Sequence, residues 1–170
     1  MEFLSLLAVI TFADFLVDAT VTSDSCIDGV TIGNQCLRFS KEALNWNNAV
    51  AACASNGGQL ASLTQPAEVQ AYVLRTYGGN KPYWAGGSDT AQEGSWIWLS
   101  GEPFQDQFPW VEGEPNNGVW HGGYSGEEDC LKVNWMGGYN DGSCTIKHRY
   151  ICENGDTEGR ANQHPPGVNE

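Results

Sequence analysis

The residues Trp110-Val111-Glu112-Gly113-Glu114-Pro115-Asn116 stand at the centre of a long segment rich in glycine, proline, asparagine and acidic side chains. Two later runs, Glu128-Asp129-Cys130 and Tyr139-Asn140-Asp141, carry the same kinds of oxygen donor in sequence typical of loops. Protein-bound calcium takes about six to eight oxygen ligands from carboxylates, amide oxygens and main-chain carbonyls. The sequence therefore predicts a calcium site, with positions left open for a further ligand, whose side-chain donors are Glu114, Asn116, Glu128, Asn140 and Asp141.

Segments on either side of this region show the periodicities of helices and strands. One helix is predicted over 43–55, where apolar residues recur at i, i+4 and i+7. A second helix is predicted after Thr64, which offers an N-cap, and Pro66, and it ends before Gly78. Together with the strands, these helices indicate one α+β domain with small antiparallel sheets and a long loop region. The strands are predicted in aromatic or β-branched pieces at 30–34, 36–39, 83–87, 95–99, 131–135 and 150–152.

The two ends of the chain differ in composition from its middle. Residues 1–19 are mostly apolar and end in a sequence that suits a signal-peptidase site, so we interpret them as the signal peptide of a secreted protein. Asp14 and Asp18 argue against a membrane-spanning helix, and no later segment is apolar enough for membrane insertion. The expected domain covers 20–153, and the polar stretch 154–170 is expected to be a disordered tail.

Cysteine count and charge restrict the chemistry further. Six cysteines in a chain expected to enter an oxidising compartment predict three disulfides, and their spacing leaves many pairings open. A bridge between Cys26 and Cys36 could close the first hairpin, and the lack of a Cys-x-x-Cys pair speaks against zinc. The formal net charge of −13 makes nucleic acid a poor partner.

Several separated motifs stand in a characteristic order along the chain. They are Cys53 with Gly57-Gly58-Gln59-Leu60-Ala61, Tyr83-Trp84-Ala85-Gly86-Gly87, Trp110 to Asn116, Glu128-Asp129-Cys130 and Tyr139-Asn140-Asp141. With these motifs, the chain closely resembles the C-type lectin carbohydrate-recognition domain over nearly all of 26–152. The resemblance implies the C-type lectin fold in its long form, with disulfides Cys26–Cys36, Cys53–Cys152 and Cys130–Cys144.

The resemblance also implies a function. In the family, two adjacent sugar hydroxyls contact a Ca2+ ion, accept hydrogen bonds from asparagine amides and donate hydrogen bonds to carboxylates. The Glu-Pro-Asn order, with a cis peptide bond before Pro115, implies mannose-type glycans as the partner. The expected protein is thus a secreted calcium-dependent lectin for glycan or microbial recognition. Its sugar-binding residues would be Glu114, Asn116, Glu128 and Asn140.

Two departures from the family pattern leave alternatives open. The stretch 117–127 is long, and Trp120 within it could stack on galactose as in galactose-binding members. An accessory calcium site would use Asp89 and Glu93, and its third position is Asn117 where the family has an acid. Galactose binding through Trp120 is therefore the alternative ligand preference.

Two further classes of protein compete with the sugar-binding interpretation. A lectin fold used without sugar, as in an ice binder, is one of them, because fold does not fix function. A glycosidase with Glu114 and Glu128 as acid and base is disfavoured, since carboxylates committed to calcium cannot shuttle protons, and we expect no enzyme. Single shallow sugar sites bind at about millimolar strength, so we expect avidity from a non-covalent homo-oligomer. The other tryptophans, Trp46, Trp84, Trp96, Trp98, Trp110 and Trp135, are expected in the core.

Overall fold

The computed structural model describes residues 26, 28–78, 81–104, 110–120, 123–124, 126–134 and 138–154. The predicted signal peptide, residues 1–19, lies outside these ranges, and so does the predicted tail beyond 154. Within the described part, no helix combines the length and the apolar character that crossing a bilayer requires.

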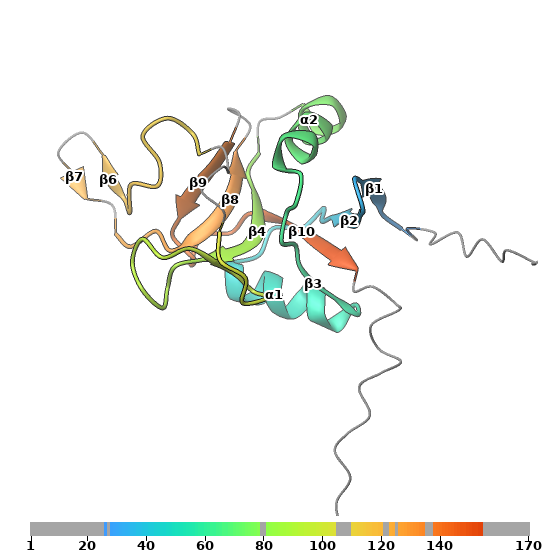
Figure 1. The fold of residues 1–170 in the computed structure, drawn as a ribbon, viewed down its shortest axis with the longest axis horizontal. Coiled ribbons are helices and arrows are strands. Elements are labelled where there is room, and N and C mark those ends of the chain that lie inside the picture. The colour runs from blue at the N-terminus through green and yellow to red at the C-terminus, as the bar shows by residue number, and fades with distance from the viewer. Residues whose placement is uncertain are drawn as a thin grey trace, which may run out of the picture.

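Most of the strands form one mixed sheet (Figure 1). They are β1 (Val30–Ile32), β2 (Gln35–Phe39), β3 (Gly58–Leu60), β4 (Tyr83–Ser88), β5 (Ile97–Trp98), β6 (Val119–Trp120), β7 (Gly123–Tyr124), β8 (Cys130–Asn134), β9 (Gly138–Gly142) and β10 (Arg149–Asn154). The sheet follows the order β1-β2-β10-β4-β8-β9, with β3 paired to β10 and β5 paired to β4. Strands β6 and β7 form a separate hairpin within the long loop region.

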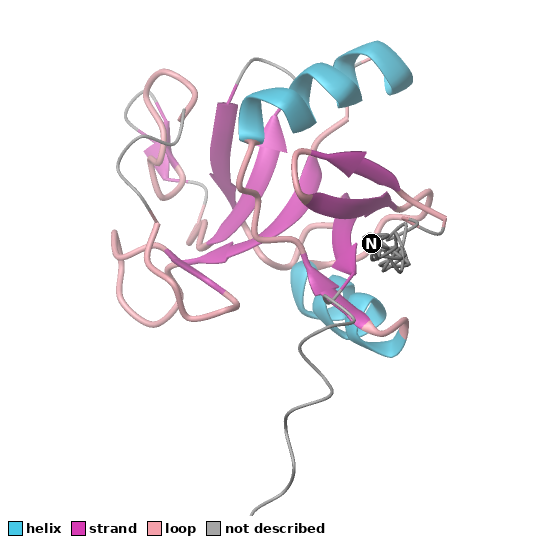
Figure 2. Ribbon diagram, turned by 45° about the vertical axis from the view of Figure 1, so that its right-hand side comes forward, coloured by secondary structure: helices cyan, strands magenta, loops and turns pink. Residues whose placement is uncertain are grey.

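Two helices lie on opposite sides of the sheet, α1 (Trp46–Ser55) and α2 (Pro66–Tyr77) (Figure 2). Alternate side chains of a strand point to opposite faces, and β4 shows this clearly. Tyr83 belongs to the core that contains Val69 and Val73 of α2. Trp84, the next residue, belongs to a second core with Trp46 of α1. The sheet therefore carries two apolar layers, and each layer is covered by one helix.

Both helices begin later than the sequence predicted, and α1 starts at Trp46 instead of residue 43. Asn45 caps α1, because its side chain accepts a hydrogen bond of 2.9 Å from the N–H of Asn48. The predicted N-cap Thr64 is wrong, since α2 begins after Gln65, whose side chain makes no capping bond. The Thr64 hydroxyl instead hydrogen-bonds to the side chain of Gln35 at 2.8 Å, which ties the helix entry to β2.

Two further features of the sheet differ from the sequence-based expectation. Asn140 and Asp141 were expected in a loop, but they lie in β9, paired with Lys132 and Leu131 of β8. The sheets were expected to be antiparallel, whereas β10 pairs in parallel with β4. The core assignment of the tryptophans is confirmed where the structure describes them: Trp46, Trp84, Trp96 and Trp98 are buried and Trp110 packs against the core, while Trp135 lies outside the described residues.

All six cysteines are paired, in the pattern that the family resemblance implied. The pairs are Cys26–Cys36, Cys53–Cys152 and Cys130–Cys144. The first closes the hairpin β1–β2, and the second joins α1 to the central strand β10 across a sequence separation of 99. The third connects the start of β8 with the residues that follow β9.

We predict that the disulfides Cys53–Cys152 and Cys26–Cys36 differ in how much each contributes to the free energy of unfolding. Removing Cys53–Cys152 as a double alanine variant should lower the free energy of unfolding by about 4.7 kcal/mol, because the cross-link restricts a long loop in the unfolded chain. Removing Cys26–Cys36, which spans a separation of only 10, should cost less than about 3 kcal/mol. Urea unfolding followed by tryptophan fluorescence compares the two variants. Equal losses would contradict the loop-length argument.

Candidate functional site

The topology of the sheet brings the predicted ligands to one edge. Strands β4 and β8 are antiparallel, so the end of β4 at Ser88 lies beside the start of β8 at Cys130. Strand β9 is antiparallel to β8 and ends at the same edge, where Gly142 pairs with Cys130. Acidic and amide side chains just inside or beyond these strand ends are therefore neighbours, although the sequence separates them widely.

An aromatic cluster supports the loop that carries Glu114. The rings of Trp98 and Phe104 stack with centroids 4.4 Å apart, and Trp96 meets Trp110 edge to face at 5.0 Å. Tyr139 of β9 is buried in the same core, and its carbonyl accepts a 2.8 Å hydrogen bond from the N–H of Val111. The loop thus enters the site from a fixed point on the sheet.

Asp141 holds the next part of the loop. Its side chain is 1% exposed, and its Oδ2 accepts hydrogen bonds from the backbone N–H groups of Asn116 at 2.9 Å and Asn117 at 2.6 Å. Successive N–H groups of this kind form a small concavity that binds an anionic oxygen. To present its N–H to Asp141, the backbone of Asn117 adopts a left-handed φ of 47°, which asparagine tolerates better than most residues. The peptide bond between Glu114 and Pro115 is cis, as the resemblance implied.

Oxygen atoms without donors gather beside this contact. The Nδ2 of Asn140 donates a 2.8 Å hydrogen bond to Oε1 of Glu114, so the two side chains face each other. Buried polar atoms in proteins nearly always have a hydrogen-bond partner, and exceptions call for an explanation such as an ion. Within the described part of the chain, four side-chain oxygens of the predicted set have none. They are Glu114 Oε2, Asn116 Oδ1, Asn140 Oδ1 and Asp141 Oδ1.

Glu128 completes the predicted set from the other side of the loop. Its N–H donates a 2.8 Å hydrogen bond to Oδ1 of Asn117, which fixes the residue beside the Glu-Pro-Asn turn. Its half-buried carboxylate accepts a hydrogen bond from the backbone of Gly118. The structure therefore brings all of the predicted calcium ligands into one region.

The carboxylates of this region repel one another. Burial raises the pKa of Glu114 to about 7, and the neighbouring carboxylate of Asp141 adds to the effect. Burial also raises the pKa of Glu128, against the opposing charge of Lys132. Lys132 was not identified from the sequence as a neighbour of the site, because no feature of the sequence distinguishes it from other lysines in strands. Such a group of desolvated carboxylates favours either protons or a cation.

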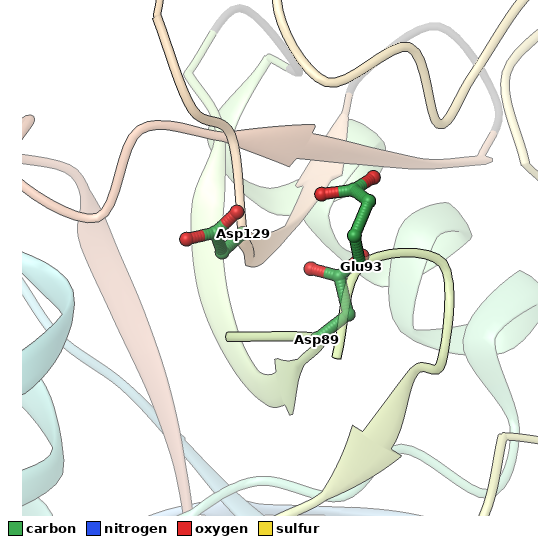
Figure 3. Close-up of side chains that lie close together, drawn as sticks. All are labelled: Asp89, Glu93 and Asp129. Carbon is green, nitrogen blue, oxygen red and sulfur yellow. The ribbon is translucent and has the colours of Figure 1, made fainter. Parts of the chain in front are cut away.

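A second acidic group lies next to the first. One carboxylate oxygen from each of Asp89, Glu93 and Asp129 lies within 4.8 Å of the others, and Figure 3 shows the three side chains around a common space. Asp89 is 3% exposed, burial raises its pKa to about 6, and its Oδ1 has no partner among the described residues. These features fit a cation.

Asn117, the expected third residue, lies beside this group. Its Nδ2 donates a 2.8 Å hydrogen bond to Glu93, and its Oδ1 accepts one from the N–H of Glu128. Asp129 adds a carboxylate that was not predicted for this site, although it stands directly after Glu128 in the quoted motif. Trp120 contributes its backbone to β6, and its side chain lies outside what the structure describes.

Comparison with known proteins identifies the family of the chain. The family described as "Lectin C-type domain" matches residues 42–154, which is most of the described chain. The chain belongs to the C-type lectin family. The match is to the C-type lectin carbohydrate-recognition domain, whose relatives are carbohydrate-binding proteins and not enzymes. The glycosidase alternative is thereby set aside.

Individual relatives of this C-type lectin domain show how far the likeness extends. "C-type lectin domain family 4 member M" of Symphalangus syndactylus is 36% identical over 69% of this chain and 26% of its own length, so the chain spans about a quarter of that relative. "Galactose-specific lectin nattectin" of Thalassophryne nattereri is 31% identical over 76% of this chain and 80% of its own. The solved "Mouse Scavenger Receptor C-type Lectin carbohydrate-recognition domain" superposes with a TM-score of 0.63 at 28% identity, covering 75% of this chain and 95% of that one.

We predict that the calcium-free domain becomes less stable as the pH rises through the range of the Glu114 titration. The raised pKa means that the folded protein holds a proton on Glu114 between pH 4.5 and about 7, where the unfolded chain has released it. Proton uptake on folding makes stability fall with rising pH in that window. Thermal melts in EDTA should show this fall in Tm.

The Glu114→Gln variant should show a smaller fall in Tm across the same window, because it cannot ionise there. Glu102→Gln serves as the control, since Glu102 is exposed and outside the ligand set, and it should retain the full slope. A slope that is the same in all three proteins would show that Glu114 does not carry the effect.

Proposed function

We propose that this domain binds Ca2+ through Glu114, Asn116, Glu128, Asn140 and Asp141, and through it the adjacent hydroxyls of a mannose-type sugar. The buried, unpartnered oxygens of Glu114, Asn116, Asn140 and Asp141 carry the proposal. Carboxylate and amide oxygens are the donors that calcium prefers. Bound calcium would supply coordination positions for two hydroxyl oxygens of the sugar.

The side chains of the site would supply the remaining contacts to those hydroxyls. An amide nitrogen of Asn116 or Asn140 can donate to a hydroxyl oxygen, and the carboxylate of Glu114 or Glu128 can accept the hydroxyl proton. Asn140 retains a second N–H for this purpose, because only one is used toward Glu114. Asp141, anchored to the backbone of the Glu-Pro-Asn turn, would hold the ion without touching the sugar.

Two observations favour different sugars. The Glu-Pro-Asn order resembles that of mannose-binding members, and leaving a polar group of the site unpaired by the wrong sugar costs about 1–3 kcal/mol. The long loop with Trp120, and the likeness to a relative named as galactose-specific, favour galactose. Ring stacking contributes about 0.5–1.5 kcal/mol by analogy with aromatic pairs. We infer that the hydrogen-bond order dominates and that galactose is the weaker ligand.

We also propose that the protein is secreted and acts in clusters. Three disulfides suit an oxidising compartment, and the composition of residues 1–19 suits a secretory leader. Because every cysteine is paired within the chain, any oligomer would be non-covalent. Analytical ultracentrifugation of the protein would test whether it forms such an oligomer.

We predict that calcium and sugar binding are lost together when Asp141 is changed. In the wild-type protein, calcium at about a hundred times its Kd should add about 2.7 kcal/mol to the free energy of unfolding, and mannose should bind only in its presence. Asp141→Asn should remove both effects, since the neutral amide is a weaker ligand. Differential scanning fluorimetry and calorimetric titration measure them. Mannose binding that persists in excess chelator would reject the mechanism.

The sugar preference can be tested by exchanging the two ends of the Glu-Pro-Asn motif. We predict that mannose competes better than galactose with the wild-type protein, and that Glu114→Gln with Asn116→Asp reverses the order. Trp120→Ala should weaken galactose more than mannose. Competition on a mannose-coated surface provides the measurement. If galactose is the better competitor and the double exchange leaves it so, the loop and not the motif sets the preference.

A further inference from the structure

A pocket lined by basic side chains lies outside the calcium region. It has a volume of about 250 Å³ and is lined by Lys41, Lys81, Lys147, His148 and Arg149 together with small apolar contacts. The whole chain has only 8 lysines and arginines against 21 acidic residues, so half of its basic side chains meet in this one place. None of the described residues that line the pocket is acidic.

The sheet topology explains why these residues meet. Strands β4 and β10 are parallel neighbours, with Arg149 paired to Tyr83, so both begin at the same edge. Lys81 lies two residues before β4, and Lys147 lies two residues before β10. Strand β2 runs antiparallel to β10 and ends at this edge, which brings in Lys41 two residues after it. The segments next to β2, β4 and β10, which are distant in sequence, therefore each contribute one lysine.

The backbone and the less exposed members of the pocket are held in place. Leu44 and His148 exchange backbone hydrogen bonds of 2.9 and 3.0 Å, which joins the loop after β2 to the start of β10. The His148 ring packs on Trp84 with centroids 4.6 Å apart, and Nη1 of Arg149 donates to the hydroxyl of Tyr83 at 3.3 Å. The acid nearest in sequence, Glu42, accepts a 2.8 Å hydrogen bond from the hydroxyl of Tyr150.

We propose that this pocket binds a tetrahedral oxyanion, the sulfate or phosphate group of a small ester. Lysine ammonium groups and an arginine guanidinium supply the charge-assisted donors that such a group accepts. The neutral side chain of His148 adds a donor without charge, since burial and then the charge of Lys132 lower its pKa to about 4. The volume suits one such group with the sugar or other carrier attached to it.

The rest of the surface argues for a small ligand over a polyanion. With a net charge of −13, the protein repels nucleic acid and anionic membranes at long range. None of the residues that line the pocket belongs to the proposed calcium or sugar ligands. Binding in the pocket should therefore not require calcium.

The test uses the full chain in EDTA, with calorimetric titration of a hexose 6-sulfate, a hexose 6-phosphate, inorganic sulfate, inorganic phosphate and the plain hexose. We expect the esters to bind more weakly as salt is raised, and the plain hexose not to bind. The sulfate and phosphate arms identify which group is preferred, and the inorganic ions show whether the carrier contributes. Ester binding that appears only when calcium replaces EDTA would place it at the calcium region and overturn the proposal.

Variants locate the binding. Lys81→Gln and Lys147→Gln should each weaken it about tenfold, the worth of one charge-assisted hydrogen bond, and Lys147→Arg should largely keep it. Arg75→Gln removes the same charge from the exposed face of α2 and should change the affinity less than about twofold. Retained Tm and calcium response establish folding of each variant. Equal weakening by Arg75→Gln, or no ester binding by the wild type, would refute the pocket.

Discussion

The carboxylate of Asp141 is the contact on which the site depends. It lies in a strand, almost wholly buried, and accepts hydrogen bonds from two successive N–H groups of the loop that carries Glu114 and Asn116. A buried charge is costly unless it is paired or hydrogen-bonded, so one end of this carboxylate is satisfied by backbone and the other faces Glu114. The same residue therefore fixes the loop and creates the need for a cation.

The loop of this region is held in place by the sheet and by aromatic side chains. The loop has little regular structure, and long loops of that kind are ordered only when something else holds them. Here the aromatic layer of Trp96, Phe104 and Trp110 lies under it, and the hydrogen bond from Val111 to Tyr139 attaches it to β9. Electrostatic repulsion among the acids is thus opposed by apolar packing that does not depend on any ion.

The sequence predicted the parts whose signals are local. The helices follow from apolar periodicity, and the proposed ligand set, whose side chains the fold brings into one region, follows from motifs that keep their order along the chain. The strand position of Asn140 and Asp141 could not be predicted, because asparagine and aspartate are depleted in strands and only pairing with β8 overrides that preference. The grouping of Asp129 with Asp89, and the parallel pairing of β4 with β10, depend on contacts between distant segments. Contacts between distant segments produce no periodic pattern in the sequence.

The place of β10 in the sheet has a consequence for how the protein is made. This strand is formed by 149–154, yet it pairs with β2, β3 and β4, all of which are synthesised long before it. A nascent chain can close the local hairpins β1–β2 and β8–β9, but it cannot complete the sheet until residues 149–154 have left the ribosome. Folding that waits for distant partners is slow. Until then Cys53 lacks its native partner Cys152, so its disulfide must form late in biogenesis.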